Sequence, residues 1–190
     1  MGFALAEECA ARGAEVTLVA GPVSLKTVHP SIKRINVESA LEMYDAAMAH
    51  YPQQDAAILC AAVADYRPGT RSENKIKRTG DEMVIRLVPN PDIAASLGRI
   101  TKENQTLVGF ALETNDEEQN ALGKLRRKNL DFIVLNSLQD EGAGFKGDTN
   151  KITILNNKGE KSAYPLKSKK DVASDIITRL REVISAKQSR

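Results

Sequence analysis

The sequence predicts an α/β protein in which helices cover both faces of a mainly parallel sheet. Three observations favour this fold. Helix-like and strand-like segments alternate along most of the chain, the candidate strands are almost entirely apolar, and 42% of the residues are hydrophobic, enough for one continuous core. Because 190 residues is the length of one domain, we expect a single three-layer, Rossmann-like domain over residues 1–190.

The first third of the chain predicts two helices and three strands. Apolar residues on one face and a terminating Gly13 indicate a helix over 2–12, and β-branched residues indicate a strand at 16–19. A helix that leads into a parallel strand is itself normally preceded by a strand, so we expect the chain to lack the natural beginning of its sheet. The next strand, helix and strand are expected at 35–37, 39–50 and 56–63.

Residues 66–89 interrupt this alternation. The segments 75–78 and 83–88 alternate polar and apolar side chains across a turn at 79–81, which indicates a two-stranded ribbon that leaves the main sheet. An isolated ribbon is only marginally stable in water. We therefore expect it to pack against a second copy of the chain, which would make the protein a homodimer.

The second half of the chain resumes the alternation. Asn90-Pro91-Asp92 is typical of a helix start, with Pro91 at the first helical position, and a helix over 115–128 carries acidic residues early and basic residues late, as the helix dipole favours. The remaining strands, a hairpin and a last amphipathic helix are expected at 107–111, 131–135, 151–155, 161–165 and 172–184.

Charge and composition exclude several classes of protein. The chain has 27 Lys and Arg against 25 Asp and Glu, and a net charge of +2 is too small to attract nucleic acid or an acidic membrane, so any anion site must be local. No apolar run approaches the roughly 18 residues of a membrane span, and we expect a cytoplasmic protein. Cys9 and Cys60 have no CxxC spacing, which favours buried thiols over a zinc site.

Small and polar residues follow the predicted strands, at the edge where open α/β sheets bind ligands. Ala61 and Ala62 would let backbone amides approach a ligand closely, and Asp65 could bind a metal ion or a ribose hydroxyl. Tight packing of the strand against a helix is the alternative explanation for the alanines.

Two basic clusters could face this edge. Lys75 and Lys77 alternate on a predicted strand and so share one face, while Lys124 and Lys128 lie one turn apart on a predicted helix. A solvated edge strand would explain the first cluster and complementation of the helix dipole the second. Convergence of both clusters on one crevice would instead favour a polyphosphate ligand, although the chain contains neither GxxxxGK[ST] nor GxGxxG.

Five motifs, in order along the chain, carry a resemblance to one family. They are Ala-Ala-Val-Ala-Asp-Tyr-Arg at 61–67, Lys-Ile-Lys-Arg at 75–78, Asn-Pro-Asp at 90–92, Gly-Phe-Ala-Leu-Glu-Thr at 109–114 and the basic segment at 124–131. Over essentially its whole length the chain resembles the phosphopantothenoylcysteine synthetases, the second activity of the bacterial two-part coenzyme A biosynthesis protein.

The resemblance implies a ligase that joins 4′-phosphopantothenate to L-cysteine. CTP would activate the carboxylate as an acyl-cytidylate with release of pyrophosphate, and the amine of cysteine would then displace CMP. The resemblance also implies Mg²⁺ as cofactor, a homodimer to which the ribbon contributes, and in many relatives a flavin-dependent decarboxylase fused ahead of this region. The family pattern continues upstream of Met1 through a strand and a Ser-Gly-Lys loop, whose asparagine is tied to the cysteine-dependent step.

The resemblance further implies the residues of the site. Lys75 matches the first lysine of a KxKK motif that contacts the nucleotide and is needed for activity, although here the motif ends in Arg78. Residues 78–82 resemble a flap over the bound intermediate. The positions that match nucleotide-binding residues are Ala61, Ala62, Asp65, Lys75, Asn90, Pro91, Phe110, Lys124 and Lys128. Among them, Phe110 would offer an apolar surface to the base and the lysines would supply charge to the phosphates.

Two other functions remain compatible with the predicted fold. An NAD(P)-dependent oxidoreductase could use the same crevice, because a fold does not determine a function. A noncatalytic module that binds RNA or another polyanion could use the basic residues, but only 4% of the chain is aromatic, which is poor for stacking on bases.

Overall fold

The structure is a computed structural model, and it describes residues 1–78, 80, 82–113, 117–137 and 148–189. The turn predicted at 79–81, the start of the helix predicted over 115–128 and most of the segment between strand 131–135 and the hairpin lie outside these residues. The helices are α1 (Gly2–Ala11), α2 (Ala40–His50), α3 (Ile93–Ile100), α4 (Glu117–Arg127) and α5 (Lys169–Gln188), with a short 3₁₀ helix at Tyr51–Gln53. The strands are β1 (Val16–Ala20), β2 (Ile32–Asn36), β3 (Ala56–Leu59), β4 (Tyr66–Pro68), β5 (Leu87–Pro89), β6 (Thr106–Glu113), β7 (Phe132–Ser137), β8 (Thr149–Asn150), β9 (Ile152–Asn156), β10 (Lys161–Ala163) and β11 (Lys167–Ser168).

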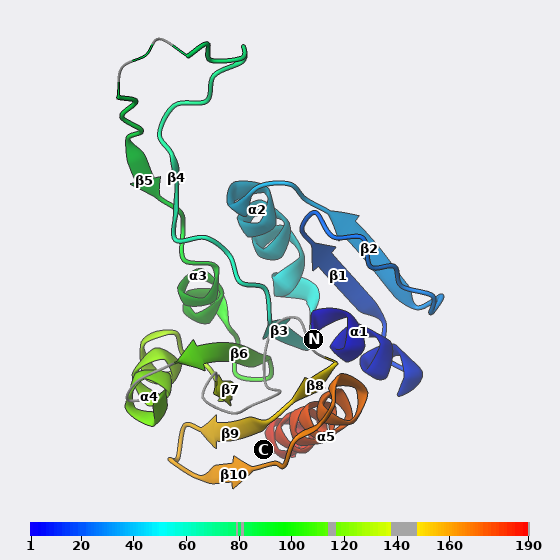
Figure 1. Cartoon of the computed structure of the whole chain (residues 1–190). Coiled ribbons are helices and arrows are strands. Elements are labelled where there is room, and N and C mark those ends of the chain that lie inside the picture. The colour runs from blue at the N-terminus through cyan, green and yellow to red at the C-terminus, as the bar shows by residue number, and fades with distance from the viewer. Residues whose placement is uncertain (79, 81, 114–116, 138–147, 190) are drawn as a thin grey trace.

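The centre of the molecule is a five-stranded sheet with the order β10-β9-β7-β6-β3 (Figure 1). β3, β6 and β7 run parallel to one another, and the hairpin β9–β10 joins β7 in the antiparallel sense. β1 and β2 form a separate parallel pair. The predicted α/β fold with a mainly parallel sheet is therefore confirmed.

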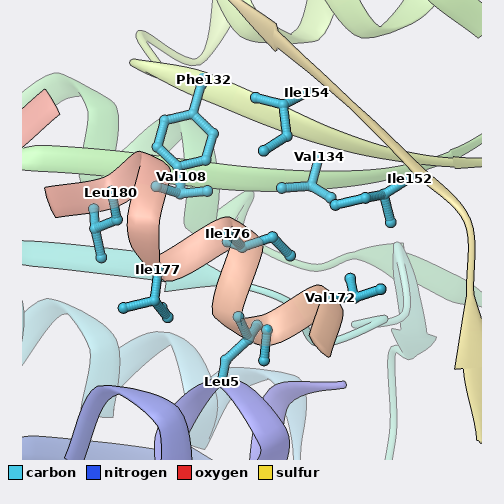
Figure 2. Packing of buried hydrophobic residues seen from close by; sticks show 11 residues of the cluster. Leu5, Val108, Phe132, Val134, Ile152, Ile154, Val172, Ile176, Ile177 and Leu180 are labelled. Carbon is cyan, nitrogen blue, oxygen red and sulfur yellow. The ribbon is translucent and has the colours of Figure 1, made fainter. Parts of the chain in front are cut away.

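One face of the sheet is covered by α1 and α5. Figure 2 shows Ile176 of α5 among Val108, Val134 and Ile152 of the sheet, and these four side chains are at most 1% exposed. Burying one such aliphatic side chain contributes roughly 1.5–3 kcal/mol to folding. This cluster supplies much of the stability of the domain.

The opposite face of the sheet is covered by α3 and α4. Leu97 of α3 and Leu125 of α4 pack in one buried cluster with Leu107 and Ile133 of the sheet. Leu107 and Val108 are neighbours in β6 and are both 0% exposed, because successive side chains of a strand point to opposite faces. The three-layer arrangement thus explains why the strands read as continuous apolar runs.

Several predicted boundaries were wrong. β3 ends at Leu59 instead of residue 63, because its ladder with β6 ends at the pair Leu59 and Gly109, after which the chain leaves the sheet. β2 spans Ile32–Asn36 rather than 35–37, because its pairing with β1 begins at Val16 and Ile32. Pro91 precedes the helix it was expected to open, because the side chain of Asp92 caps the first turn.

The outer edges of β1 and β3 have no partner strand in the part of the chain that the structure describes. Each edge therefore presents a row of backbone amides and carbonyls that can pair with a further strand.

Residues 66–89 form an arm that extends away from the layered body (Figure 1). Its strands β4 and β5 pair only at the base, in three residue pairs from Tyr66 with Pro89 to Pro68 with Leu87. The pairing predicted between 75–78 and 83–88 was wrong: of these described residues only Leu87 and Val88 lie in a ladder, and their partners are Pro68 and Arg67. Farther out the arm is open to solvent, and Val84 is 91% exposed. Among the described residues, no helix is both long enough and apolar enough to cross a membrane.

Candidate functional site

The loop that follows β3 lies at the carboxyl edge of the parallel strands. Ala61, Ala62 and Asp65 are exposed there, outside any strand. Their exposure argues against the alternative that the two alanines are small for the sake of sheet packing, because that packing would bury them. The loop therefore has accessible backbone and one carboxylate at the edge where α/β sheets bind ligands.

Phe110 stands beside the end of β3. The ladder pairs Leu59 with Gly109, so Phe110 comes immediately after the last paired residue of β6 on that side. Its ring is half-buried against the cluster under α1 and α5. Phe110 thus places an apolar side chain immediately beyond the paired end of β3.

Asn90 connects the loop after β3 to the base of the arm. Its backbone amide donates to the carbonyl of Asp65 at 2.8 Å, and its side-chain Nδ2 donates to the carbonyl of Ala64 at 2.8 Å. The side-chain Oδ1 accepts a hydrogen bond from Arg67 at 3.1 Å. Both ends of the Asn90 carboxamide are therefore engaged within the protein, and the adjoining Pro91 is half-buried.

Lys128 reaches the N-terminus of α3. Its ammonium lies 3.0 Å from the carboxylate of Asp92, which caps α3 by accepting from the amide of Ala95 at 2.9 Å. Partial burial acts to raise the pKa of Asp92, but the Ala95 amide and the Lys128 ammonium outweigh it and hold the pKa below its ordinary value. The ion pair holds the half-buried ammonium of Lys128 beside Asp92, which lies two residues after Asn90 in the sequence.

A close helix contact fixes the position of Lys128. At Gly98 of α3, a Cβ atom would lie 2.0 Å from the carbonyl oxygen of Lys128, so only glycine allows α3 and the end of α4 to approach this closely. Asn129 then takes a left-handed conformation with φ 51° and donates from Nδ2 to the Gly98 carbonyl at 3.0 Å. Lys124 is half-buried one turn earlier on α4.

The two basic clusters do not converge within one chain. Lys75 and Lys77 are exposed on the arm beyond its paired base, and Figure 1 shows that segment far from α4, which carries Lys124. The predicted convergence is therefore wrong for a single copy of the protein, because the arm projects from the body instead of folding back over the sheet edge.

Metal and thiol chemistry can be assessed from the side chains present. The described residues contain no group of three or more His, Cys, Asp or Glu that could hold a metal ion, so Asp65 belongs to no such cluster there. Mg²⁺ is commonly held by one or two carboxylates together with substrate phosphates, which such a site satisfies. Both cysteines are free, and burial raises the pKa of Cys9 to about 11, which keeps it protonated and unreactive.

Sequence reasoning missed the contributions of Arg67, Asp92 and Gly98. Arg67 lies within the motif at 61–67, and Asp92 was seen only as part of a helix start. The N-capping position of Asp92 was readable from the sequence. Its ion pair with Lys128 was not, because the two residues are far apart along the chain.

Comparison with known proteins shows a match over nearly the whole chain. The model of the DNA/pantothenate metabolism flavoprotein C-terminal domain matches residues 1–184. The coenzyme A biosynthesis bifunctional protein CoaBC of Vibrio vulnificus is 48% identical over 186 residues, which are 97% of this chain and 46% of that protein. CoaBC of Escherichia coli is 44% identical over 189 residues, 96% of this chain and 46% of that protein.

A protein named cysteine/cysteine sulfinic acid decarboxylase, from an unidentified prokaryote, is 56% identical over 180 residues, 95% of this chain and 50% of that protein. The chain thus spans about half the length of the curated relatives it matches.

Solved structures match the fold as well. The crystal structure of the C-terminal domain of CoaBC has a TM-score of 0.81 and 37% identity, covering 97% of this chain and 84% of that one. The H337A mutant of Cab2 in complex with phosphopantothenate-cysteine has a TM-score of 0.71 and 15% identity, covering 98% of this chain and 79% of that one, which supports the fold alone.

Proposed function

The chain belongs to the DNA/pantothenate metabolism flavoprotein C-terminal domain family, and from this premise we propose that it joins 4′-phosphopantothenate to L-cysteine in coenzyme A biosynthesis, with CTP as the activating nucleotide. The observation that carries the proposal is the set of contacts around residues 90–92. Hydrogen bonds join Asn90 to Ala64 and Asp65 of the loop after β3. Lys128 forms an ion pair with Asp92, two residues farther along the chain.

The proposed chemistry divides a difficult condensation into two displacements. A carboxylate oxygen of 4′-phosphopantothenate attacks the α-phosphorus of CTP, the bond to pyrophosphate breaks, and an acyl-cytidylate forms. The amine of cysteine then attacks the acyl carbon, CMP leaves with the bonding electrons, and the nitrogen loses a proton. Positioning and neutralisation of phosphate charge supply most of the catalysis in the first step.

The protein residues have distinct parts in this proposal. Ala61 and Ala62 leave the backbone amides of the loop open to the nucleotide, and the ring of Phe110 borders the base. Lys124 and Lys128 attract the phosphates, with Lys128 exchanging Asp92 for a phosphate oxygen. Asp65 would hold Mg²⁺, which neutralises phosphate charge when it is bound.

A second copy of the chain is needed to bring Lys75 to the site. The arm carries Lys75 away from its own sheet edge, and it also exposes apolar side chains that water does not favour, namely Tyr66, Ile76, Met83, Val84, Ile85 and Leu87. Docking of the arm on a second copy would cover this surface and present Lys75 to the partner. We therefore propose a homodimer with Lys75 as the catalytic residue.

A decarboxylase unit is the proposed partner in the pathway, fused or separate. The curated relatives are about twice as long as this chain, and one of them is named a decarboxylase. Co-purification of a flavin-containing protein with this chain would support the proposal. A source cell that contains no such decarboxylase would contradict the proposal.

The test is a search for the acyl-cytidylate with cysteine withheld. The chain is incubated with CTP, Mg²⁺ and 4′-phosphopantothenate, and we expect the acyl-cytidylate by mass spectrometry together with CTP-dependent pyrophosphate. Lys75→Gln should abolish both without changing the melting temperature. Thermal shifts with CTP and with NADPH form the second arm, because only a ligand that binds the folded chain raises the melting temperature. Stabilisation by NADPH alone, or tight and salt-sensitive binding of RNA, would contradict the proposal.

A further inference from the structure

The base of the arm is held by two side chains, Arg67 and Asn90, which we name the arm clamp. Arg67 donates from Nη1 to the carbonyl of Pro89 at 2.6 Å and to Oδ1 of Asn90 at 3.1 Å. Asn90 in turn donates from Nδ2 to the carbonyl of Ala64 at 2.8 Å. The arm clamp therefore ties the outgoing strand β4, the returning strand β5 and the loop after β3 to one another.

Little else fixes the direction of the arm. Next to the three residue pairs, the amide of Gly69 donates to the carbonyl of Arg86 at 2.8 Å, and this is the outermost backbone bond between the two sides of the arm among its described residues. Farther out, most of the described residues are exposed and belong to no strand. A small rotation at the base moves the far end of a long arm by a large distance, so the arm clamp decides where the outer arm points.

The same carboxamide also shapes the loop that follows β3. Asn90 uses Nδ2 on the Ala64 carbonyl, Oδ1 on Arg67 and its backbone amide on the Asp65 carbonyl. These bonds use one of the two Nδ2 hydrogens and one of the two Oδ1 lone pairs, and they hold the carboxamide in a fixed orientation toward Ala64 and Arg67. Asn90 therefore holds the loop after β3 to the base of the arm.

We propose that Arg67 and Asn90 are positioning residues that set the direction of the arm relative to the loop at 61–65. This direction places Lys75 against the same loop, 61–65, of the second copy of the chain. The inference rests on the proposed function for the part played by Lys75. It gives the Asn90 side chain a positioning role through Ala64 and Arg67 in addition to the nucleotide contact that the resemblance implies. Precise placement of a charged group is worth more in catalysis than its mere presence.

Hydrogen exchange of the unliganded chain tests the local claim. In Arg67→Ala the amides of Gly69 and Asn90, both hydrogen-bonded at the arm base, should exchange faster, while that of Val108 in the sheet stays protected. Arg67→Lys should restore part of the protection. Arg86→Ala is the matched control, because it removes the same charge from the same arm and its side chain has no hydrogen bond or ion pair recorded within the described residues. Unchanged exchange in Arg67→Ala, or equal loss in Arg86→Ala, would overturn the inference.

A double-mutant cycle on CTP affinity tests the link to Lys75. Calorimetry should show about 10-fold weaker binding for Arg67→Ala and no further weakening when Arg67→Ala is added to Lys75→Gln, because both changes remove the same interaction. Additive losses would mean that Arg67 acts independently of Lys75 and would overturn the inference. Absence of CTP binding by the unmodified chain would overturn the proposed function, and the hydrogen-exchange result at the arm base distinguishes that outcome from failure of the clamp itself.

Discussion

The central sheet and the arm differ in what holds their strands in place. In β6, Leu107 and Val108 point to opposite faces and are both fully buried under helices, whereas in the arm Val84 is 91% exposed. The inner strands of the sheet are covered on both faces by helices of the same chain. The arm has only its base and its exposed apolar side chains, which indicates that its structure and its use depend on a second surface.

A matched pair of valines gives the largest expected contrast. Val134→Ala in β7 should lower the free energy of unfolding by about 2–3 kcal/mol, because it leaves a cavity in the cluster under α5. Val84→Ala should change it by less than about 0.5 kcal/mol. Urea denaturation of both variants, at concentrations low enough to give single chains, measures the difference. Equal effects at the two sites would mean that the arm is as well packed as the sheet.

A matched pair of glycines sharpens the contrast within the body. Gly98→Ala should destabilise the chain by about 1–3 kcal/mol, because the new Cβ would meet the Lys128 carbonyl at 2.0 Å. It should also weaken CTP binding by displacing Lys128. Gly123→Ala in α4 meets only the flexible end of Arg127 at 3.5 Å and should stabilise the helix by up to about 1 kcal/mol. The denaturant midpoints of Gly98→Ala and Gly123→Ala measure the two changes in stability. Stabilisation by both substitutions would contradict the close contact of α3 with the end of α4.

A smaller effect is expected from the ion pair beside the arm base. The pKa of Asp92 is held below the ordinary value of 3.8, so its contribution to stability is full above about pH 3.8 and is lost as the pH falls through the folded-state pKa. Asp92→Asn keeps a good helix cap and removes this titration. Because Asp92 is largely exposed, the difference at pH 7 should stay under about 1 kcal/mol. The denaturant midpoints of the unmodified chain and of Asp92→Asn are measured between pH 2 and 6, and they should converge at the acid end. Midpoints that differ by the same amount at every pH would contradict a stabilising role of the ion pair.

The smallest effect on stability, and the sharpest test of the arm, is expected from Val84→Asp. A charge at this exposed position should leave the folded single chain almost unchanged, yet it should weaken the homodimer by placing an unpaired charge in the interface. Sedimentation velocity over a range of concentrations separates the two species. Lys33→Asp in β2, also exposed but far from the arm, is the control. A dimer as tight as that of the unmodified chain would place the interface elsewhere.

The elements themselves were largely readable from the sequence. Continuous apolar stretches marked β6 and β7, and apolar spacing marked α1 and α5, because burial on one or both faces leaves a periodic trace in the residues. The paired strands of the arm were predicted at the wrong residues. Residues 75–78 and 83–88 carry an alternating pattern, but among the described residues the ladder of the arm joins 66–68 to 87–89, so only residues 87 and 88 of the predicted segments are paired.

The α/β class, most of the helices and strands and the family motifs could be read from residue order and local side-chain chemistry. The contacts between distant segments appear only in the folded chain: Asn90 bonds to Ala64 and Arg67, Lys128 pairs with Asp92, and the arm extends away from the layered body. The physical reason is that hydrogen bonds and ion pairs join groups that are distant along the chain. Their partners are set by how whole layers pack, and no periodicity within a segment records that.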